Sequence, residues 1–417
     1  MPSALLFAGK YGTIRHSISK LTLFFIKGDS MKKPLSILLA LLLGLSLVSC
    51  IQPPQPNAVT STTAQEAETD PPAKPPLPKD FSNPKATARE FLSDNANALV
   101  DCSKREYSYA EMEADLEELA ELHPTRFSYR SFGKSVAGRE LYVGILGNPN
   151  AKKQVLISAG LHGREYLTPL LVMKQLEFYL TYYDVGQYSR IPYATLFEEV
   201  CFYIIPMNNP DGIMLSQEGI SSLTDPTLRA TVEAIYYSDL SAGLTSQTNI
   251  NKYLQYWKAN ACGVDLNRNF DALWEKYFNY SLPSFAQYKG PSAASEPETR
   301  ATVELIESLP NLSAVLCIHS QGEVLYWNCG QEQTLLKSTL DFTEALADRT
   351  GYKIVEEQNN DASLSDWCAL KKGLISVTIE TGAGLCPLDL DKFEPIWNDH
   401  FDLLPLTAAY FRDSDRK

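Results

Sequence analysis

Continuous apolar runs separated by helical patterns dominate the middle of the chain. Strands that are buried on both faces produce such uninterrupted runs, and helices between them supply the crossover connections of parallel strands. Four runs rich in β-branched residues alternate with long helical patterns, the runs at 154–159, 200–205, 312–318 and 374–379 and the clearest helices at 167–182 and 298–309. The pattern therefore predicts an α/β fold with a mixed, largely parallel twisted sheet that carries helices on both faces.

This domain is expected to follow a lead-in segment at 87–106. An acidic amphipathic helix is predicted over 110–122, and two short strands are predicted over 127–132 and 141–146, with glycines in the turn between them. No stretch of linker composition interrupts the rest of the chain. Residues 107–417 are therefore predicted to form a single domain.

The beginning of the chain has the pattern of an exported protein. Residues 31–49 place two lysines before an apolar stretch of about a dozen residues and end in small residues before Cys50, which is the layout of a secretory signal peptide. The residues that end at Cys50 resemble a bacterial lipoprotein box, which implies cleavage before Cys50 and a lipid on its sulfur. Met31 is then the natural start, and residues 1–30 are an upstream extension. A membrane-spanning helix is the alternative, but 34–48 is shorter than the roughly 20 residues that a span needs.

The composition of the segment after this signal and the charge of the whole chain limit the possible partners. Nine of the 25 prolines fall between Pro53 and Pro84, so residues 50–86 are predicted to form a disordered tether behind the lipid. The chain has 37 Lys and Arg against 50 Asp and Glu, a formal charge of −13. Such an acidic chain is not expected to bind nucleic acid, and it would reach a membrane only through the lipid on Cys50. We expect a monomer that is anchored at a bacterial cell surface or secreted.

Candidate chemistry lies where the predicted strands end. Ligands of open α/β sheets bind beyond the carboxyl ends of the strands. His162 and Glu165 follow the first run, His319 follows the third, and Glu380 follows the fourth. Because His162 and Glu165 are three residues apart where a helix begins, both side chains can bind one ion from the same face. Two imidazoles and one carboxylate with an open fourth position are typical of a hydrolytic zinc site, with one Zn²⁺ per chain.

Each of these residues also has a simpler interpretation. An HxxE pair is short and common, so His162 can cap a helix while Glu165 is a solvated acid. His319 argues against this interpretation, because a polar group that closes a buried strand needs a partner. Glu380 could form an ion pair with Lys371 or Lys372. If a metal is bound, Glu380 is well placed to act as the general base.

The segment 263–270 adds an arginine that could select the substrate. Arg268 beside Asn267 can hold a carboxylate through a bidentate pair and an amide donor, which would favour substrates with a free C-terminus. Asp265 can accept the second ring proton of a metal-binding histidine and so fix its tautomer. The alternatives are a surface arginine and a surface acid in a loop.

In this order, the motifs resemble the zinc metallocarboxypeptidase family, that of carboxypeptidases A and B. The resemblance runs from about Tyr107 to Gly384 and includes further motifs at 133–139, 209–212, 366–367 and 378–380. It implies hydrolysis of C-terminal peptide bonds by attack of a metal-bound water. It also implies roles for single positions: His162, Glu165 and His319 as zinc ligands, Glu380 as general base, Asn267 and Arg268 as the carboxylate clamp, Arg164 as a substrate contact on the non-prime side, and Asp265 as the partner of His162.

Two features of the family are missing from this chain. Many members carry a tyrosine shortly before the Asp-Trp pair that closes over the substrate, but residues 356–365 include no tyrosine. Members also have an arginine upstream of the clamp that stabilises the oxyanion, whereas no arginine lies between Ala230 and Arg268. Lys258 is the expected catalytic substitute, a point charge in place of a planar fork.

Several functions stay open at this stage. The stretch 257–267 is similar to that of bacterial members that cleave cell-wall stem peptides, including γ-D-glutamyl-diaminopimelate peptidases, so both peptides and peptidoglycan stem peptides are candidate substrates. A zinc-dependent amidase or deacylase is an alternative enzyme. A non-catalytic surface binding module is a further alternative, against which the complete ligand set with Glu380 argues.

Cysteine and the remaining histidines add little chemistry. Seven cysteines follow Cys50, an odd number without CxxC spacing, so they do not predict a zinc cage and assign no disulfide. His400 lies in a polar context and is expected to be solvated.

Overall fold

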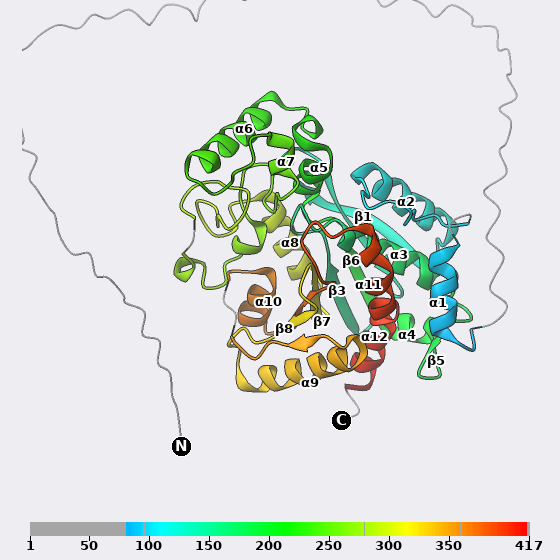
Figure 1. Ribbon diagram of the computed structural model, residues 1–417. Helices are drawn as coiled ribbons and strands as arrows, with labels where there is room; N and C mark the ends of the chain where they lie inside the picture. Colours follow the sequence, from blue (N-terminus) through cyan, green and yellow to red (C-terminus); the bar gives the residue numbers. More distant parts are fainter. Residues whose placement is uncertain (1–80, 95–96, 279, 359–360, 415–417) are drawn as a thin grey trace, which may run out of the picture. The chain divides into compact units, whose positions relative to one another are not determined.

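The computed structural model describes residues 81–94, 97–278, 280–358 and 361–414 (Figure 1). The predicted signal peptide, Cys50 and most of the predicted tether lie outside these residues. In the part of the chain that is described, no helix combines the length and the apolar character that crossing a bilayer requires.

One sheet of eight strands organises the domain. In spatial order the strands are β1 (Phe127–Lys134), β2 (Glu140–Leu146), β6 (Val200–Ile205), β3 (Lys153–Ser158), β7 (Leu312–His319), β10 (Ile375–Glu380), β8 (Val324–Tyr326) and β9 (Lys353–Ile354). The four central strands β6, β3, β7 and β10 are parallel to their neighbours in this group, while β1, β2 and β8 add antiparallel pairs toward the edges. The mixed, largely parallel sheet predicted from the sequence is confirmed.

The central strands bury both of their faces. Along β3, Val155 and Ile157 enter one hydrophobic core and Leu156 enters the other, and each is at most 1% exposed. The second core also contains Cys201 and Cys317 as buried free thiols. An uninterrupted apolar run is the consequence, since successive side chains of a strand point to opposite faces and both faces are dry here.

Helices cover both faces of this sheet (Figure 1). The first core joins the sheet to α1 (Pro84–Ser93), α2 (Tyr109–Leu122), α3 (Leu167–Thr181), α4 (Tyr193–Glu199), α9 (Gln333–Thr350), α11 (Phe393–His400) and α12 (Leu403–Ser414). The second core joins it to α8 (Pro297–Glu307) and α10 (Leu364–Lys372). A smaller cluster holds α5 (Pro210–Glu218), α6 (Pro226–Ser241) and α7 (Ile250–Leu254) together, and a two-stranded ribbon pairs β4 (Gln187–Tyr188) with β5 (Ile191–Pro192).

The folded domain begins earlier than the predicted boundary at residue 107. Phe81 is 5% exposed, and its ring lies 5.1 Å from that of Tyr182 and 5.5 Å from that of Tyr193. α1 starts at Pro84, inside the range that was predicted to be a tether, and it buries Ala88 completely. The Pro-rich composition concealed this start, because a few apolar side chains suffice to dock the segment on the core.

His400, the last residue of α11, is buried instead of solvated. Its exposed fraction is 0%, its Nδ1 lies 2.9 Å from the carbonyl oxygen of Ile396, and its Nε2 has no hydrogen-bond partner among the described residues. Burial lowers the pKa of His400 to about 4, compared with about 6.5 for an exposed histidine. The polar neighbours in the sequence gave no sign of this, because they lie on the other side of an amphipathic helix.

Stability is expected to decrease as the pH falls from about 6.5 toward 4, since the unfolded chain then binds a proton that the folded chain does not bind. His400 lowers the free energy of unfolding by at most about 3 kcal/mol, and most of this loss has occurred when the pH reaches 4. Denaturant unfolding of the wild type and of His400→Gln between pH 7.5 and 4 tests the expectation. The advantage of the wild type over the variant should shrink across that window, and an advantage that does not depend on pH would contradict the assignment.

Candidate metal centre

Three side chains meet at the carboxyl edge of the central strands. His162 lies in the loop after β3, Glu165 lies just before α3, and His319 is the last residue of β7. The Nδ1 of His162 is 2.8 Å from Oε1 of Glu165, the Nδ1 of His319 is 2.9 Å from Oε2 of the same carboxylate, and the two Nδ1 atoms are 3.2 Å apart. All three residues are buried. Because parallel strands end at one edge of the sheet, residues that are 157 positions apart in the chain come into contact here.

This donor set fits one zinc ion. Zinc is bound by imidazole nitrogen and carboxylate oxygen at about 2.1 Å, which places neighbouring donor atoms of a tetrahedral site roughly 3.4 Å apart. The two Nδ1 atoms are 3.2 Å apart, each lies within 2.9 Å of one oxygen of Glu165, and one donor atom from each residue can be chosen within 4.8 Å of the others. Two histidine nitrogens and a carboxylate that all face one point need a shared cation or shared protons between them. Among the described residues, no other group of histidine, cysteine and acidic side chains converges in this way.

The second nitrogen of each imidazole faces a fixed polar group. His162 Nε2 is 3.2 Å from Oδ1 of Asp265, which is 0% exposed, and His319 Nε2 is 3.5 Å from Nδ2 of Asn267. Burial alone would raise the pKa of Asp265, but the interaction with His162 and with nearby cations holds this pKa well below its ordinary value. Asp265 therefore stays an anionic acceptor that orients the ring of His162.

Glu380 ends β10 beside this group. Its backbone is in register with that of His319 in the neighbouring parallel strand. Burial raises the pKa of the Glu380 carboxyl to about 7, with His319 acting in the opposite direction. A carboxyl with a pKa near neutrality can both accept and return a proton. The alternative ion pairs are not found, since Lys371 contacts Asp271 and Lys372 contacts Glu307.

Two further predicted cations belong to the loops of the metal centre. Lys258, in the loop after α7, places its Nζ 3.8 Å from Oε1 of Glu165. Arg164 lies between the two ligands of its own loop, and its Nε is buried without a hydrogen-bond partner among the described residues. The structure thus places the charge of Lys258 next to a candidate zinc ligand, while the substrate contact of Arg164 stays a prediction.

Arg268 is held in one orientation by its neighbours. Its Nε donates to the hydroxyl of Tyr277 at 3.0 Å, its Nη1 donates to the carbonyl of Asn267 at 2.9 Å, and its Nη2 lies 3.2 Å from Oδ2 of Asp361. Among the described residues, these contacts use three of the five N–H groups of a guanidinium, which leaves two for a ligand. The sequence did not point to Tyr277 or Asp361, because both lie in loops without a recognisable motif.

Asn267 contacts two other parts of the site, and its role in the carboxylate clamp stays a prediction. Its Nδ2 faces His319, and its Oδ1 accepts the backbone N–H of Leu364 at 3.1 Å. Its side chain therefore supports a candidate zinc ligand and the start of α10, and only the backbone carbonyl of Asn267 touches Arg268. In the described part of the chain, one N–H of the Asn267 amide is left for a substrate carboxylate, since the contact with His319 uses the other.

The loop after β3 and the loop after α7, which carries Lys258, pack tightly against each other. Asn209 donates through Nδ2 to the carbonyls of Leu161 and Ala259, which joins the loop after β3 to the loop after α7. A Cβ added to Gly163 would lie 2.3 Å from the carbonyl oxygen of Gly212, so only glycine fits there. The motifs at 162–165 and 209–212 are thus explained by the close approach of their backbones.

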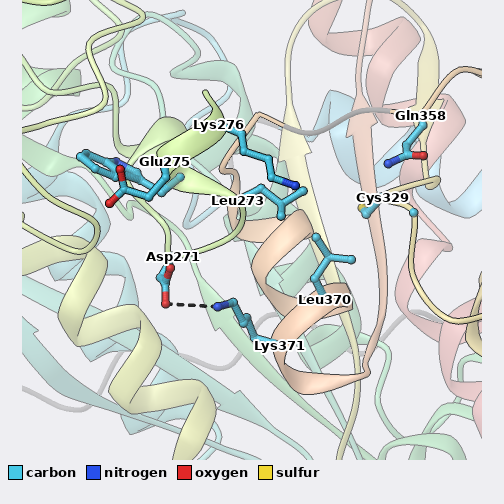
Figure 2. A pocket seen from close by; sticks show the side chains of 10 residues that line it. Asp271, Leu273, Glu275, Lys276, Cys329, Gln358, Leu370 and Lys371 are labelled. Atoms are coloured by element: carbon cyan, nitrogen blue, oxygen red, sulfur yellow. Dashed lines mark hydrogen bonds and ion pairs between the residues drawn. The ribbon is translucent and has the colours of Figure 1, made fainter. Parts of the chain in front are cut away.

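A cavity of about 480 Å³ lies outside this centre, and Figure 2 shows the side chains that line it. Leu370 and Lys371 of α10 form part of its wall, and Lys371 pairs with Asp271 at 3.3 Å. No candidate site residue lines this cavity. We therefore do not assign this cavity to the metal centre.

Several known proteins are similar to this chain in sequence. The chain is 29% identical over 317 residues to the uncharacterized protein YqgT of Bacillus subtilis, covering 74% of this chain and 80% of that protein. It is 27% identical over 299 residues to γ-D-glutamyl-L-diamino acid endopeptidase 1 of Lysinibacillus sphaericus, covering 71% and 70%. Mast cell carboxypeptidase A of Rattus norvegicus is 27% identical over 56% of this chain, which corresponds to 52% of its own length.

Solved structures support the architecture. The carboxypeptidase A of Helicoverpa armigera superposes with a TM-score of 0.55 at 20% identity, over 80% of this chain and 81% of that one. Thrombin-activatable fibrinolysis inhibitor gives a TM-score of 0.58 at 18% identity, over 80% and 82%. At these identities the likeness shows the fold alone. The sequence profile of the zinc carboxypeptidase family matches residues 112–402, a range that includes every residue of the candidate metal centre, and the chain therefore belongs to this family of zinc metallopeptidases.

Proposed function

We propose that this protein hydrolyses the peptide bond beside a terminal carboxylate, as a zinc-dependent exopeptidase. The main observation is the convergence of His162, Glu165 and His319 on one point beside the carboxyl of Glu380. A structural metal site would be closed by a fourth protein ligand, whereas three ligands beside a carboxyl with a pKa near 7 are suited to hydrolysis.

Each residue then has a defined task. A zinc ion held by His162, Glu165 and His319 would polarise the scissile carbonyl and lower the pKa of a water ligand. Glu380 accepts a proton from the attacking water and returns it to the leaving amine. Lys258, whose Nζ lies near Glu165, stabilises the negative charge that develops on the carbonyl oxygen.

Arg268 and Arg164 bind the substrate. Arg268 offers its two remaining N–H groups to the terminal carboxylate of the substrate. Arg164, whose Nε is buried without a hydrogen-bond partner among the described residues, would bind the substrate on the other side of the scissile bond. Asp265 keeps the ring of His162 in place throughout.

A peptidoglycan stem peptide is the second candidate substrate. Its support is the similarity to γ-D-glutamyl-L-diamino acid endopeptidase 1, which extends over 70% of that protein. The signal-like residues 31–49 and Cys50 favour export and lipid anchoring, and such a protein would meet cell-wall peptides.

Arg268→Ala is expected to lower kcat/KM about 100-fold for peptides with a free C-terminal carboxylate, because one or two charge-assisted hydrogen bonds are lost. The same peptides with an amidated C-terminus should react slowly with both enzymes and show little difference. Matched free, amidated and muropeptide substrates, assayed with and without a chelator, provide the measurement.

Lys371→Ala is a suitable control, since this lysine lies on α10 and pairs with Asp271 away from the centre. An equal loss on free and amidated peptides would favour the amidase or deacylase. A purified protein without stoichiometric zinc, and without activity after zinc is added, would favour the non-catalytic binding module.

A further inference from the structure

We propose that Gln287 is a positioning residue that holds the arginine of the carboxylate clamp and the partner of a zinc ligand in one arrangement. It is connected to Arg268 through the hydroxyl of Tyr277. It also contacts Asp265, which faces His162. The first connection rests on the proposed function, because Arg268 is the proposed site of the substrate carboxylate, whereas the second concerns metal binding alone.

The short segment that contains Gln287 is hydrogen-bonded to the site on both sides of this residue. The backbone carbonyl of Phe285 accepts the N–H of Lys258 at 2.8 Å. The backbone carbonyl of Tyr288 accepts the N–H of Asp265, also at 2.8 Å. Gln287 is therefore fixed between two attachments to the loops of the candidate metal centre.

The backbone of Gln287 contacts the partner of a candidate zinc ligand directly. Its N–H donates to Oδ2 of Asp265 at 2.9 Å, while Oδ1 of the same carboxylate lies 3.2 Å from Nε2 of His162. Because the two oxygens of Asp265 have different partners, the N–H of Gln287 sets the rotation of the carboxylate that orients His162.

The side chain of Gln287 extends the contact to the clamp. The Nε of Arg268 donates to the hydroxyl of Tyr277 at 3.0 Å, so the hydroxyl proton needs an acceptor of its own. Oε1 of Gln287 is that acceptor. An amide oxygen cannot donate, so it keeps a lone pair of the hydroxyl directed at Arg268. The direction of donation is thus fixed from Arg268 to Tyr277 and from Tyr277 to Gln287.

The conformation of Gln287 fits this double use. Its backbone is in the left-handed region, with a φ of 69°. Residues other than glycine rarely adopt this conformation, which persists where the surroundings determine it. Glycine would adopt it more readily but has no amide to offer Tyr277. The contacts with Asp265 and Tyr277 therefore explain why a glutamine is held in this conformation.

Zinc affinity tests the contact between Gln287 and Asp265. Gln287→Gly keeps the backbone N–H and the left-handed conformation, so the zinc dissociation constant should change less than about threefold. Gln287→Val strongly disfavours that conformation and should raise the dissociation constant about 10-fold, because losing an outer partner of a metal ligand costs about 10–100-fold in affinity. Competition with a chelator measures both constants. Equal zinc affinities of the two variants would overturn the inference.

Ser189→Val is the matched control for the backbone change. Ser189 is also a left-handed residue, with a φ of 48°, but it is exposed in the turn between β4 and β5. Its replacement should leave the zinc affinity unaltered. Thermal unfolding of each variant confirms that the fold is retained, and if Gln287→Val does not fold, the kinetics of the glycine variant decide.

Substrate kinetics test the contact between Gln287 and Tyr277. Tyr277→Phe and Gln287→Gly each remove one member of the same series of hydrogen bonds. Each variant should raise KM for peptides with a free C-terminal carboxylate about 10-fold and change kcat less than about threefold. The double variant should be no weaker than either single variant, because both changes interrupt the same series. Additive losses, about 100-fold in KM, would overturn the inference.

A control variant and the choice of readout separate this inference from the proposed function. Tyr237→Phe removes the hydroxyl of a tyrosine of α6 that is 62% exposed, and it should not change KM. Should no peptide be hydrolysed, the proposed function fails, whereas the zinc affinities of Gln287→Gly and Gln287→Val still decide on Gln287. If peptides are hydrolysed and KM does not respond to Tyr277→Phe or to Gln287→Gly, the proposed function stands and the inference is wrong.

Discussion

Glu380→Gln is expected to lower kcat/KM about 1,000-fold on every peptide that the enzyme cleaves, with zinc still bound in a one-to-one ratio. Glutamine keeps the size of the side chain but cannot accept a proton from water at neutral pH. The ligands His162, Glu165 and His319 do not change, so the variant separates metal binding from proton transfer. Steady-state kinetics and metal analysis of the same preparation measure the two quantities.

The size of this effect follows from the position of Glu380. Burial raises the pKa of its carboxyl to about 7, so both protonation states are accessible at neutral pH. General acid–base catalysis by a positioned side chain contributes about 10²–10⁴-fold. Glu323→Gln is the matched control, because this acid is exposed in the turn before β8 and should tolerate the change. If Glu380→Gln retained full turnover with zinc bound, the assigned base would be wrong.

The sheet and its reactive edge could be predicted because they depend on local patterns. A strand buried on both faces needs an apolar run, and the four central strands are four such runs. Parallel strands then bring their carboxyl ends to one edge, which places His162, His319 and Glu380 together without knowledge of the fold in detail. A polar residue directly after an apolar run is therefore a strong signal.

The surroundings of the centre could not be predicted in the same way. Asp361 and Tyr277 contact Arg268 from loops, and their approach depends on how α10 and the segment after Arg268 pack. Asn267 lies next to Arg268 in sequence but directs its side chain at His319. Contacts of this kind follow from loop geometry, for which the chain has no periodic pattern.

The start of the domain was predicted too late for a related reason. Residues 87–106 are polar in composition and have no long apolar run. Their attachment depends on a few specific contacts with α3, in which Glu177 accepts the backbone N–H groups of Leu99 and Val100 at 2.9 and 3.2 Å. Hydrogen bonds to the backbone of a distant segment leave no trace in the sequence of either partner.

Lys174→Met is expected to lower the free energy of unfolding by about 3–5 kcal/mol, because it leaves a buried carboxylate without its cation. Lys174 is 1% exposed, and its Nζ lies 2.8 Å from Oε2 of Glu177 and 3.3 Å from the carbonyl of Val100. The same ammonium lies 4.4 Å from the centroid of the Phe91 ring, so α1, the lead-in segment and α3 all depend on it. Denaturant unfolding measures the difference.

Two further variants show whether the effect belongs to the ion pair. Lys372→Met removes an exposed lysine that contacts Glu307, and it should change stability by less than about 1 kcal/mol. The double variant Lys174→Met/Glu177→Gln removes both buried charges, and it should be more stable than Lys174→Met alone, since no uncompensated carboxylate remains. If the lead-in segment were only a spacer before the domain, Lys174→Met would be as mild as Lys372→Met. The contacts of Glu177 with Leu99 and Val100 argue for the larger effect, because the same carboxylate must satisfy two backbone donors and one cation at once.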